Sequence, residues 1–236
     1  MSLTPDLLAL GAIWYVAFLF STTLHEAAHA FASFRLGDPT AYHGGQVSLN
    51  PLPHVRREPL GMVAVPLISY ALGGWMFGWA SAPYDPEWSM RHPRRSGLMA
   101  LAGPLANLSL VLVSGVVIRL GLGLGWFGLP TDSFGLDRLV TASGGGPMEG
   151  LAALLSVLFS LNLILFVFNL LPFPPLDGST VIQLVLSDSF SRKYQEMMRQ
   201  PMLALAGILV AWKLFGPIFR PILSTAMGLL YAGIGT

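Results

Sequence analysis

The chain lacks cysteine and carries little charge. Its 236 residues include no Cys, 13 Lys or Arg and 12 Asp or Glu, so that 11% are charged. Without thiols there is no disulfide, no thiol nucleophile and no metal site with sulfur ligands. Soluble domains carry about 25% charged residues, and the few charges here are too sparse to coat a water-soluble globule of this size.

The charge that is present is nearly balanced, at a formal net +1. No basic face for nucleic acid is implied, so nucleic acid is not an expected partner. Apolar residues make up 53% of the chain, and the mean hydropathy is +0.63. These values exclude a disordered chain, a coiled coil and an ordinary soluble enzyme. A multi-pass membrane protein surrounded by the lipid bilayer remains.

Apolar runs predict an all-α polytopic membrane protein with about five or six transmembrane helices, in a single domain over 1–236. A helix needs about 20 residues to cross the hydrocarbon core. The run at 60–80 is unusual because Pro66 and four glycines interrupt it, and these are poor residues for a helix interior. It is therefore interpreted as re-entrant. The other predicted helices lie at 7–34, 98–123, 151–171 (with a turn to 178), 201–215 and 218–234.

The first predicted helix contains an H-E-x-x-H motif, His25-Glu26-Ala27-Ala28-His29. Residues i and i+4 share a helix face, so both imidazoles can bind one zinc, and Glu26 beside them can accept a proton from water. Simple composition arithmetic predicts roughly 0.002 chance matches to this motif in the chain. Such residues at membrane depth are costly unless they pair or serve a site. The motif therefore predicts a zinc site.

A catalytic zinc needs a third protein ligand and an open position for water, and Asp177 is the candidate. Most acidic residues lie in evident loops, whereas Asp177 follows a long apolar span in a segment whose three prolines end the helix. Taken alone, this residue is typical of a turn that caps the next helix. Beside an H-E-x-x-H motif that lacks a third ligand, the role of metal ligand is favoured.

Together these motifs resemble the site-2 protease family of intramembrane zinc metalloproteases. The resemblance implies that His25, His29 and Asp177, the last in an L-D-G motif, bind one Zn²⁺ per chain. It also implies that Glu26 is the catalytic general base.

Two more segments carry the resemblance. Residues 103–107, Gly-Pro-Leu-Ala-Asn, are similar to the family's G-P-x-x-N helix. Residues 50–54, Asn-Pro-Leu-Pro-His, are similar to the N-P-L-x-H stretch of its compact bacterial branch, which lacks PDZ and CBS domains. The chain departs from that branch after His54, where Val55-Arg56 stands in place of Asp-Pro.

Three further residues are candidates to orient substrate or line a cavity: Asn107, His54 and Asn169. An Asn in an apolar helix can also simply bond a neighbouring helix, and His54 is either near the metal or at the surface. Asn162 lies seven residues before Asn169 and shares its helix face. Residues 42–49 alternate weakly, so they form either a short β-hairpin, whose edge could hold an extended substrate, or an ordinary interfacial loop.

The ligands must meet at one depth, so the spans 7–34 and 151–171 should run in the same direction. They do so if 60–80 enters and returns. This arrangement puts most cations on one side, which the positive-inside rule makes cytoplasmic. The N-terminus is then outside, and the zinc lies toward the cytoplasmic half. The cations on that side are Arg35, Arg56, Arg57, Arg91, Arg94, Arg95, Arg192, Lys193 and Arg199.

The sequence thus predicts a zinc metalloendopeptidase of a bacterial cell membrane. Its partner would be a membrane protein or membrane-embedded peptide, hydrolysed within or near a transmembrane segment. The alternative is a zinc-binding membrane protein without protease activity, a transporter or a scaffold. A transporter would usually show paired interrupted helices in two repeats, which the sequence does not show, and Glu26 would then have no role.

Overall fold

Four long helices frame the molecule. The computed structural model describes residues 4–131, 133–198 and 200–233, and within them four helices are long and apolar enough to cross a membrane. They are α1 (Pro5–Leu36), α6 (Pro93–Gly123), α7 (Pro147–Asn169) and α10 (Pro201–Leu230). The predicted helices at 7–34, 98–123 and 151–171 are thereby confirmed as long apolar helices.

The ends of these helices follow from local chemistry. Each of the four begins with proline in its first turn, where the missing N–H costs no hydrogen bond. Before α1, the Thr4 side chain accepts a hydrogen bond from the Leu7 N–H at 3.3 Å. After it, Gly37 ends the helix with φ of 105°, a left-handed conformation that favours glycine.

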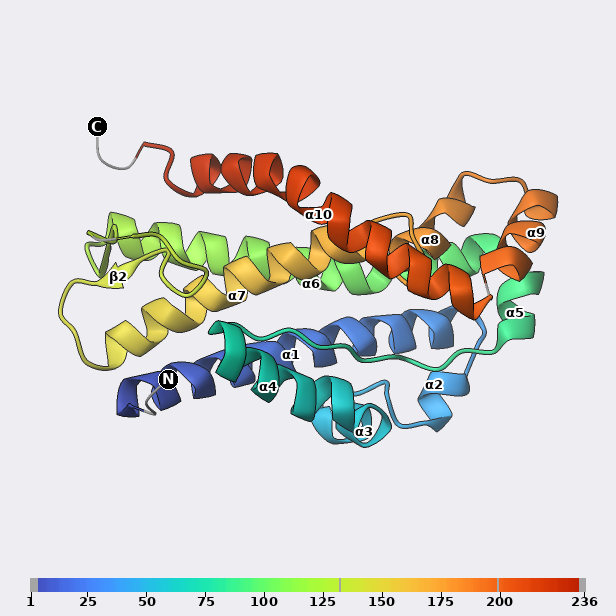
Figure 1. Cartoon of the computed structure of the whole chain (residues 1–236), viewed down its shortest axis with the longest axis horizontal. Helices are drawn as coiled ribbons and strands as arrows, with labels where there is room; N and C mark the ends of the chain where they lie inside the picture. Colours follow the sequence, from blue (N-terminus) through green and yellow to red (C-terminus); the bar gives the residue numbers. More distant parts are fainter. Residues whose placement is uncertain (1–3, 132, 199, 234–236) are drawn as a thin grey trace.

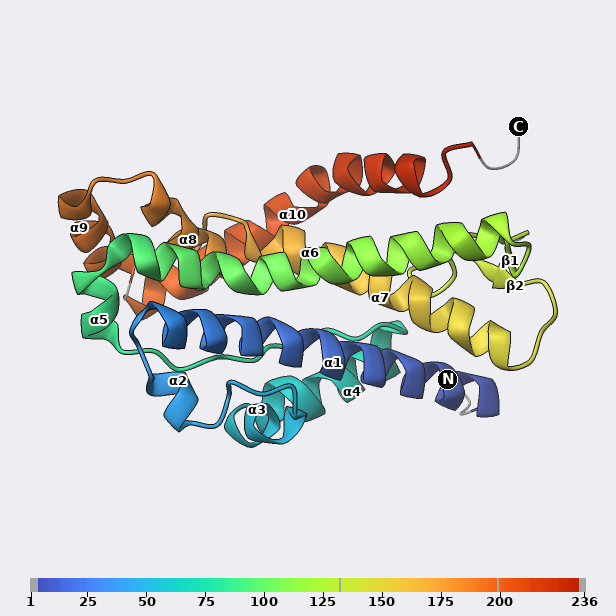
Figure 2. The same ribbon diagram turned by 180° about the vertical axis from the view of Figure 1, so that it is seen from behind.

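The long helices differ in direction. Helices α1 and α7 run the same way, whereas α6 and α10 run the opposite way (Figures 1 and 2). Trp14 and Phe18 of α1 pack with Val157 and Leu161 of α7 in one buried cluster. A second cluster joins α6 and α7 to the end of α10. The shared direction of α1 and α7 brings the end of the H-E-x-x-H helix and the L-D-G turn to the same end of the bundle.

Short elements complete the fold and gather mainly at the ends of the long helices. They are α2 (Thr40–His43), α3 (Pro51–Arg57), the π-helix η1 (Leu60–Ala64), α4 (Val65–Gly73), α5 (Pro86–Arg91), α8 (Asp177–Val181), the 3₁₀-helix η2 (Ile182–Leu184), α9 (Asp188–Met198), and strands β1 (Phe127–Gly128) and β2 (Thr141–Ala142). The strands are antiparallel, with Phe127 opposite Ala142.

The segment 60–80 doubles back on itself. Its helical part, Leu60–Gly73, is about 21 Å long at 1.5 Å per residue, too short for a ~30 Å hydrocarbon core. Gly74, with φ of 74°, ends α4. The chain then returns without helix alongside α1 (Figure 1), and the Trp79 N–H donates to the Gly61 carbonyl at 3.2 Å. The beginning and the end of the segment therefore lie side by side.

The predicted hairpin at 42–49 is wrong. The segment begins inside α2 and continues in turns, and the paired strands of the described residues lie instead at β1 and β2, between α6 and α7. The Asp38 carboxylate explains the start of α2, because it accepts from the Thr40 N–H at 3.0 Å. Gly45, with φ of 72°, then turns the chain out of an extended path. These local hydrogen bonds and turns outweighed the weak alternation of the sequence.

The two predicted C-terminal helices are one helix, α10. Pro217 and Pro221 both lie inside it, so the count of five or six spans is corrected to four long apolar helices within the described residues. In a helix that faces lipid, proline at these positions bends the axis without ending it. Arg119 of α6 donates to the carbonyls of Leu229 at 2.6 Å and Leu230 at 3.1 Å, and so caps the end of α10.

Candidate metal centre

Three side chains from α1 and α8 converge on one point. His25 and His29 lie one turn apart on α1, and their Nε2 atoms are 3.0 Å from each other. The Oδ2 atom of Asp177 lies 3.1 Å from Nε2 of His25 and 3.3 Å from Nε2 of His29. All three residues form a group whose ligand atoms lie within 4.8 Å of one another. The predicted ligands are thus brought together.

The opposite ring nitrogens of both histidines are held by acceptors. Nδ1 of His25 lies 2.6 Å from Oδ1 of Asn107, and Nδ1 of His29 lies 2.8 Å from the Met99 carbonyl. An acceptor at Nδ1 places the proton there and leaves the Nε2 lone pair free. Metal-ligating histidines are oriented in this way by outer partners.

The convergent atoms fit a zinc ion. With both protons on Nδ1, two Nε2 lone pairs and a carboxylate oxygen face each other, and Asp177 Oδ2 is buried without a hydrogen-bond partner. Three such acceptors at close range require a positive charge among them. Bond lengths of about 2.0–2.2 Å around tetrahedral zinc place ligand atoms roughly 3.3 Å apart, close to the separations found here.

The Asp177 carboxylate is suited to a metal. Its Oδ2 atom is buried and lies within 3.3 Å of both imidazole Nε2 atoms, so it offers an anionic oxygen ligand at the point where the histidines converge. A carboxylate ligand must be deprotonated, and binding of a metal favours that ionised form.

Glycines allow the elements to approach this point. A Cβ atom at Gly103 of α6 would overlap Nε2 of His29 and lie 2.6 Å from Nε2 of His25. A Cβ atom at Gly178 would overlap the carbonyl oxygens of Leu170 and Leu171. Only glycine lets α6 pass the imidazoles and lets the start of α8 pack on the end of α7. This is the physical reason for Gly in the G-P-x-x-N and L-D-G segments.

The other predicted site residues are placed differently. Glu26 is buried, at 6% exposure, next to His25 on α1. Asn107 is fully buried and uses its oxygen on His25 and its nitrogen on Asn162, so its side chain contacts a candidate ligand and does not point to open space. His54, in α3, contacts the Ser48 carbonyl at 3.1 Å through Nε2 and is not in the metal-ligand group of the described residues. Asn169 is half-buried at the end of α7.

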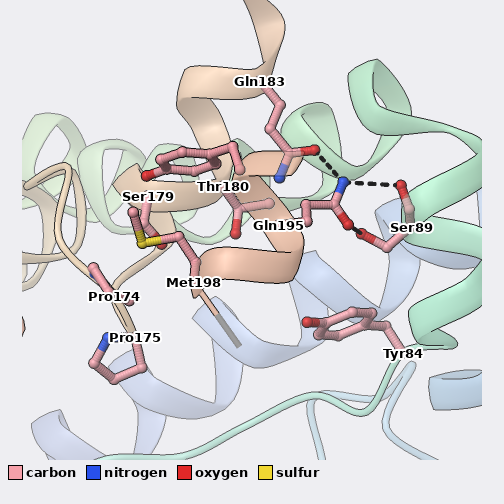
Figure 3. Close-up of a pocket in the computed structure, with 10 residues that line it drawn as sticks. Tyr84, Ser89, Pro174, Pro175, Ser179, Thr180, Gln183, Gln195 and Met198 are labelled. Carbon is pink, nitrogen blue, oxygen red and sulfur yellow. Dashed lines mark hydrogen bonds between the residues drawn. The ribbon is translucent and has the colours of Figure 1, made fainter. Parts of the chain in front are cut away.

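A polar pocket of about 200 Å³ lies beside the turn that carries Asp177 (Figure 3). Pro174, Pro175, Ser179 and Thr180 line it from the turn and α8, Tyr194 and Met198 line it from α9, and Tyr84 lines it from the segment before α5. Gln195 of α9 links the elements around the pocket, because its side-chain amide donates to Gln183 of η2 at 2.6 Å and to the Ser89 carbonyl of α5 at 3.2 Å. Among the described residues, the lining is polar but uncharged.

An apolar groove of about 320 Å³ runs beside the H-E-x-x-H turn. Helix α1 forms one side of it, and the loop before α3 forms the other. Its lining residues are Leu24, Ala27, Ala28, Phe31, Val47, Ser48 and Leu49. The polar pocket thus borders the turn that carries Asp177, and the apolar groove borders the helix that carries both histidines.

Sequence reasoning missed Ser21 and gave Asn162 only a minor place. Ser21 is fully buried and accepts a hydrogen bond from Asn162 Nδ2 at 2.8 Å. Its spacing was an available signal, because Ser21, His25 and His29 recur every four residues and so share one face of α1. The partner of each polar residue could not be read from that spacing.

Known proteins resemble this chain over most of its length. The model of Peptidase family M50 matches residues 13–211. The chain is 32% identical over 169 residues to "Putative zinc metalloprotease YwhC" of Bacillus subtilis, covering 71% of this chain and 66% of that protein. It is 32% identical over 160 residues to "Putative zinc metalloprotease Rip2" of Mycolicibacterium smegmatis, covering 68% of this chain and 52% of that protein. The Rip2 protein of Mycobacterium tuberculosis is also 32% identical, over 165 residues.

No solved structure matches significantly. The chain spans between about half and two thirds of the length of these relatives. The family match nevertheless includes both halves of the candidate metal centre, the H-E-x-x-H turn and the L-D-G turn. The chain therefore belongs to Peptidase family M50, the site-2 protease family that its motifs resemble.

Proposed function

We propose that the chain is an intramembrane zinc metalloendopeptidase that hydrolyses peptide bonds within or near transmembrane segments. The observation that carries this proposal is the convergence of His25, His29 and Asp177 beside the buried Glu26, on a helix apolar enough to cross a membrane. His25, His29 and Asp177 are the proposed zinc ligands, and Glu26 is the proposed general base.

The proposed chemistry divides between the metal and the chain. Zinc, when bound, polarises the scissile carbonyl and activates a water molecule at neutral pH. The Glu26 carboxylate takes the proton of the attacking water and passes it to the leaving amine. The partners of Nδ1 keep the two imidazoles turned inward. Burial of Glu26 keeps its oxygens away from bulk water, so the proton is exchanged within the site.

The surroundings support a membrane-embedded peptide as substrate. A transmembrane helix must unwind locally before its backbone can be attacked, since its amides are otherwise hydrogen-bonded internally. The apolar groove along Leu24 and Phe31 offers a surface for an apolar segment. The polar pocket beside Asp177 offers space for water and for unwound backbone. We propose that the substrate lies between these two spaces.

We also propose that the end of the bundle with α5, α8 and α9 is cytoplasmic. Arg91 ends α5, Arg94 and Arg95 lie in the first turn of α6, and α9 adds Arg192 and Lys193. The positive-inside rule therefore favours this orientation. Arg199, which the sequence argument also used, lies outside the described residues.

The natural absence of cysteine makes the orientation testable. In intact cells, an impermeant maleimide is expected to label Ser143→Cys, in the loop before α7, and not Ser187→Cys, before α9. Both positions are exposed. In inside-out vesicles the pattern should reverse. Labelling of Ser187→Cys alone in intact cells would contradict the orientation.

The proposed function is tested by comparing membrane proteins of cells that contain the wild type or His25→Ala. Fragments cut within or near a transmembrane segment should occur only with the wild type. With a purified substrate found in this way, a zinc chelator should stop cleavage, and one equivalent of zinc should restore it. Zinc binding without any difference in fragments would instead favour a transporter or scaffold.

A further inference from the structure

A chain of hydrogen bonds leads from the candidate ligand His25 to the backbone of α7. Nδ1 of His25 lies 2.6 Å from Oδ1 of Asn107, and Nδ2 of Asn107 donates to Oδ1 of Asn162 at 2.7 Å. Nδ2 of Asn162 in turn donates to the Leu158 carbonyl and to Ser21 Oγ, each at 2.8 Å. Both asparagines are 0% exposed, so water does not compete for these bonds.

The Leu158 carbonyl determines the direction of these hydrogen bonds, because a carbonyl oxygen can only accept. Nδ2 of Asn162 must therefore face it, and Oδ1 of Asn162 must face Asn107. That oxygen attracts Nδ2 of Asn107, which turns Oδ1 of Asn107 toward His25. An oxygen at this place requires Nδ1 of His25 to carry the proton, and Nε2 keeps its lone pair.

We propose that Asn162 is a positioning residue of the zinc site. It fixes the orientation of the Asn107 amide and, through it, both the Nδ1–H tautomer and the ring orientation of His25. The proposal rests on the proposed function only for the identity of the metal. His29 provides a comparison, because its Nδ1 contacts a backbone carbonyl directly. One ligand is thus oriented by the main chain and the other through a relay of two buried amides.

A purely structural role for Asn162 would have different consequences. Its side chain joins α7 to α6 and α1, so its loss also removes interhelical bonds. Loss of such bonds lowers stability but has no particular effect on one histidine. Loss of the relay frees the Asn107 amide to flip, and the tautomer of His25 is then no longer determined.

The first test is zinc affinity, measured by competition with a chromophoric chelator on the purified full chain in detergent. Asn162→Leu is expected to weaken zinc binding by about 10–100-fold, the range typical of outer-shell partners. Asn107→Leu should act similarly, and the double variant should lose little more, because both residues serve one relay.

Ser156→Ala is the matched control. Ser156 is another fully buried polar residue of α7, and it accepts from the Leu139 N–H at 3.0 Å, away from the metal centre. This variant should change zinc affinity by less than about threefold, well below the effect of an outer-shell partner. If it weakens zinc binding as much as Asn162→Leu does, the proposal is overturned.

The second test reads the tautomer directly by nitrogen NMR of labelled histidine in the metal-free protein. The His25 signal, assigned with His25→Gln, should show a protonated Nδ1 in the wild type, whether or not Nε2 also carries a proton, and loss of the Nδ1 proton from part of the molecules in Asn162→Leu. Asn162→Ser keeps a polar group there and replaces Asn162→Leu if that variant does not fold. An unchanged tautomer and unchanged zinc affinity in the folded variant would overturn the proposal. A wild type that binds no zinc would instead overturn the proposed function.

Discussion

Replacing Glu26 with Gln is expected to abolish peptide cleavage while zinc binding is retained. The substitution keeps the size of the side chain but removes the group that accepts the proton, and a positioned general base contributes about 10²–10⁴-fold to rate. Glu26 is not among the three convergent ligands, so the zinc content should stay near one per chain. Cleavage of a purified membrane substrate and metal analysis of the same sample measure both effects.

The same variant should also retain its substrate. Because binding surfaces and metal remain, Glu26→Gln purified from membranes should be enriched in uncut transmembrane proteins, which mass spectrometry would identify. His25→Ala is the control, since it lacks a zinc ligand. A Glu26→Gln variant that cleaves at the wild-type rate would refute the role of this residue. Equal enrichment by both variants would show that the retained proteins are not substrates held at the metal.

Replacing Gly103 with Ala is expected to destroy the metal site with only a small change in stability. Alanine is favoured over glycine in a helix interior by about 0.8–1.0 kcal/mol, but overpacking costs about 1–3 kcal/mol, so the unfolding temperature should fall by no more than a few degrees. The added Cβ, however, would overlap Nε2 of His29 and lie 2.6 Å from Nε2 of His25, where the metal must be reached. Zinc affinity should fall by about 100-fold or more, at or beyond the upper end of outer-shell effects.

Gly123→Ala is the matched control for this prediction. Gly123 also lies in α6, but a Cβ atom there meets no other atom within 4 Å. This variant should keep both its zinc and its activity. Thermal unfolding in detergent, together with chelator competition, separates the two effects of Gly103→Ala. Wild-type zinc affinity in Gly103→Ala would show that α6 moves away from the imidazoles without cost.

The convergence of His25, His29 and Asp177 could be predicted because its signals are local. H-E-x-x-H places two imidazoles on one helix face whatever surrounds them, and proline-rich residues before Asp177 end a helix wherever they occur. The common direction of α1 and α7 followed from the need for both motifs to meet. The prediction of a hairpin at 42–49 was wrong because its alternation was weak, and a hydrogen bond from the Thr40 N–H to Asp38 favours α2, which continues to His43 within that segment.

The sequence by itself determined that this chain belongs in a membrane, that it has a zinc-binding pattern and that Glu26 lies beside the ligands. These conclusions depend on composition and on spacing within one helix. Only the tertiary structure decided that Gly103 packs against the imidazoles. It also decided that the Asn107 side chain forms a hydrogen bond with His25 and does not line open space. It also decided that Asn162 directs this amide from a third helix. Such contacts join residues 55 and 82 positions apart, and their geometry depends on how the helices pack, which helical periodicity does not encode.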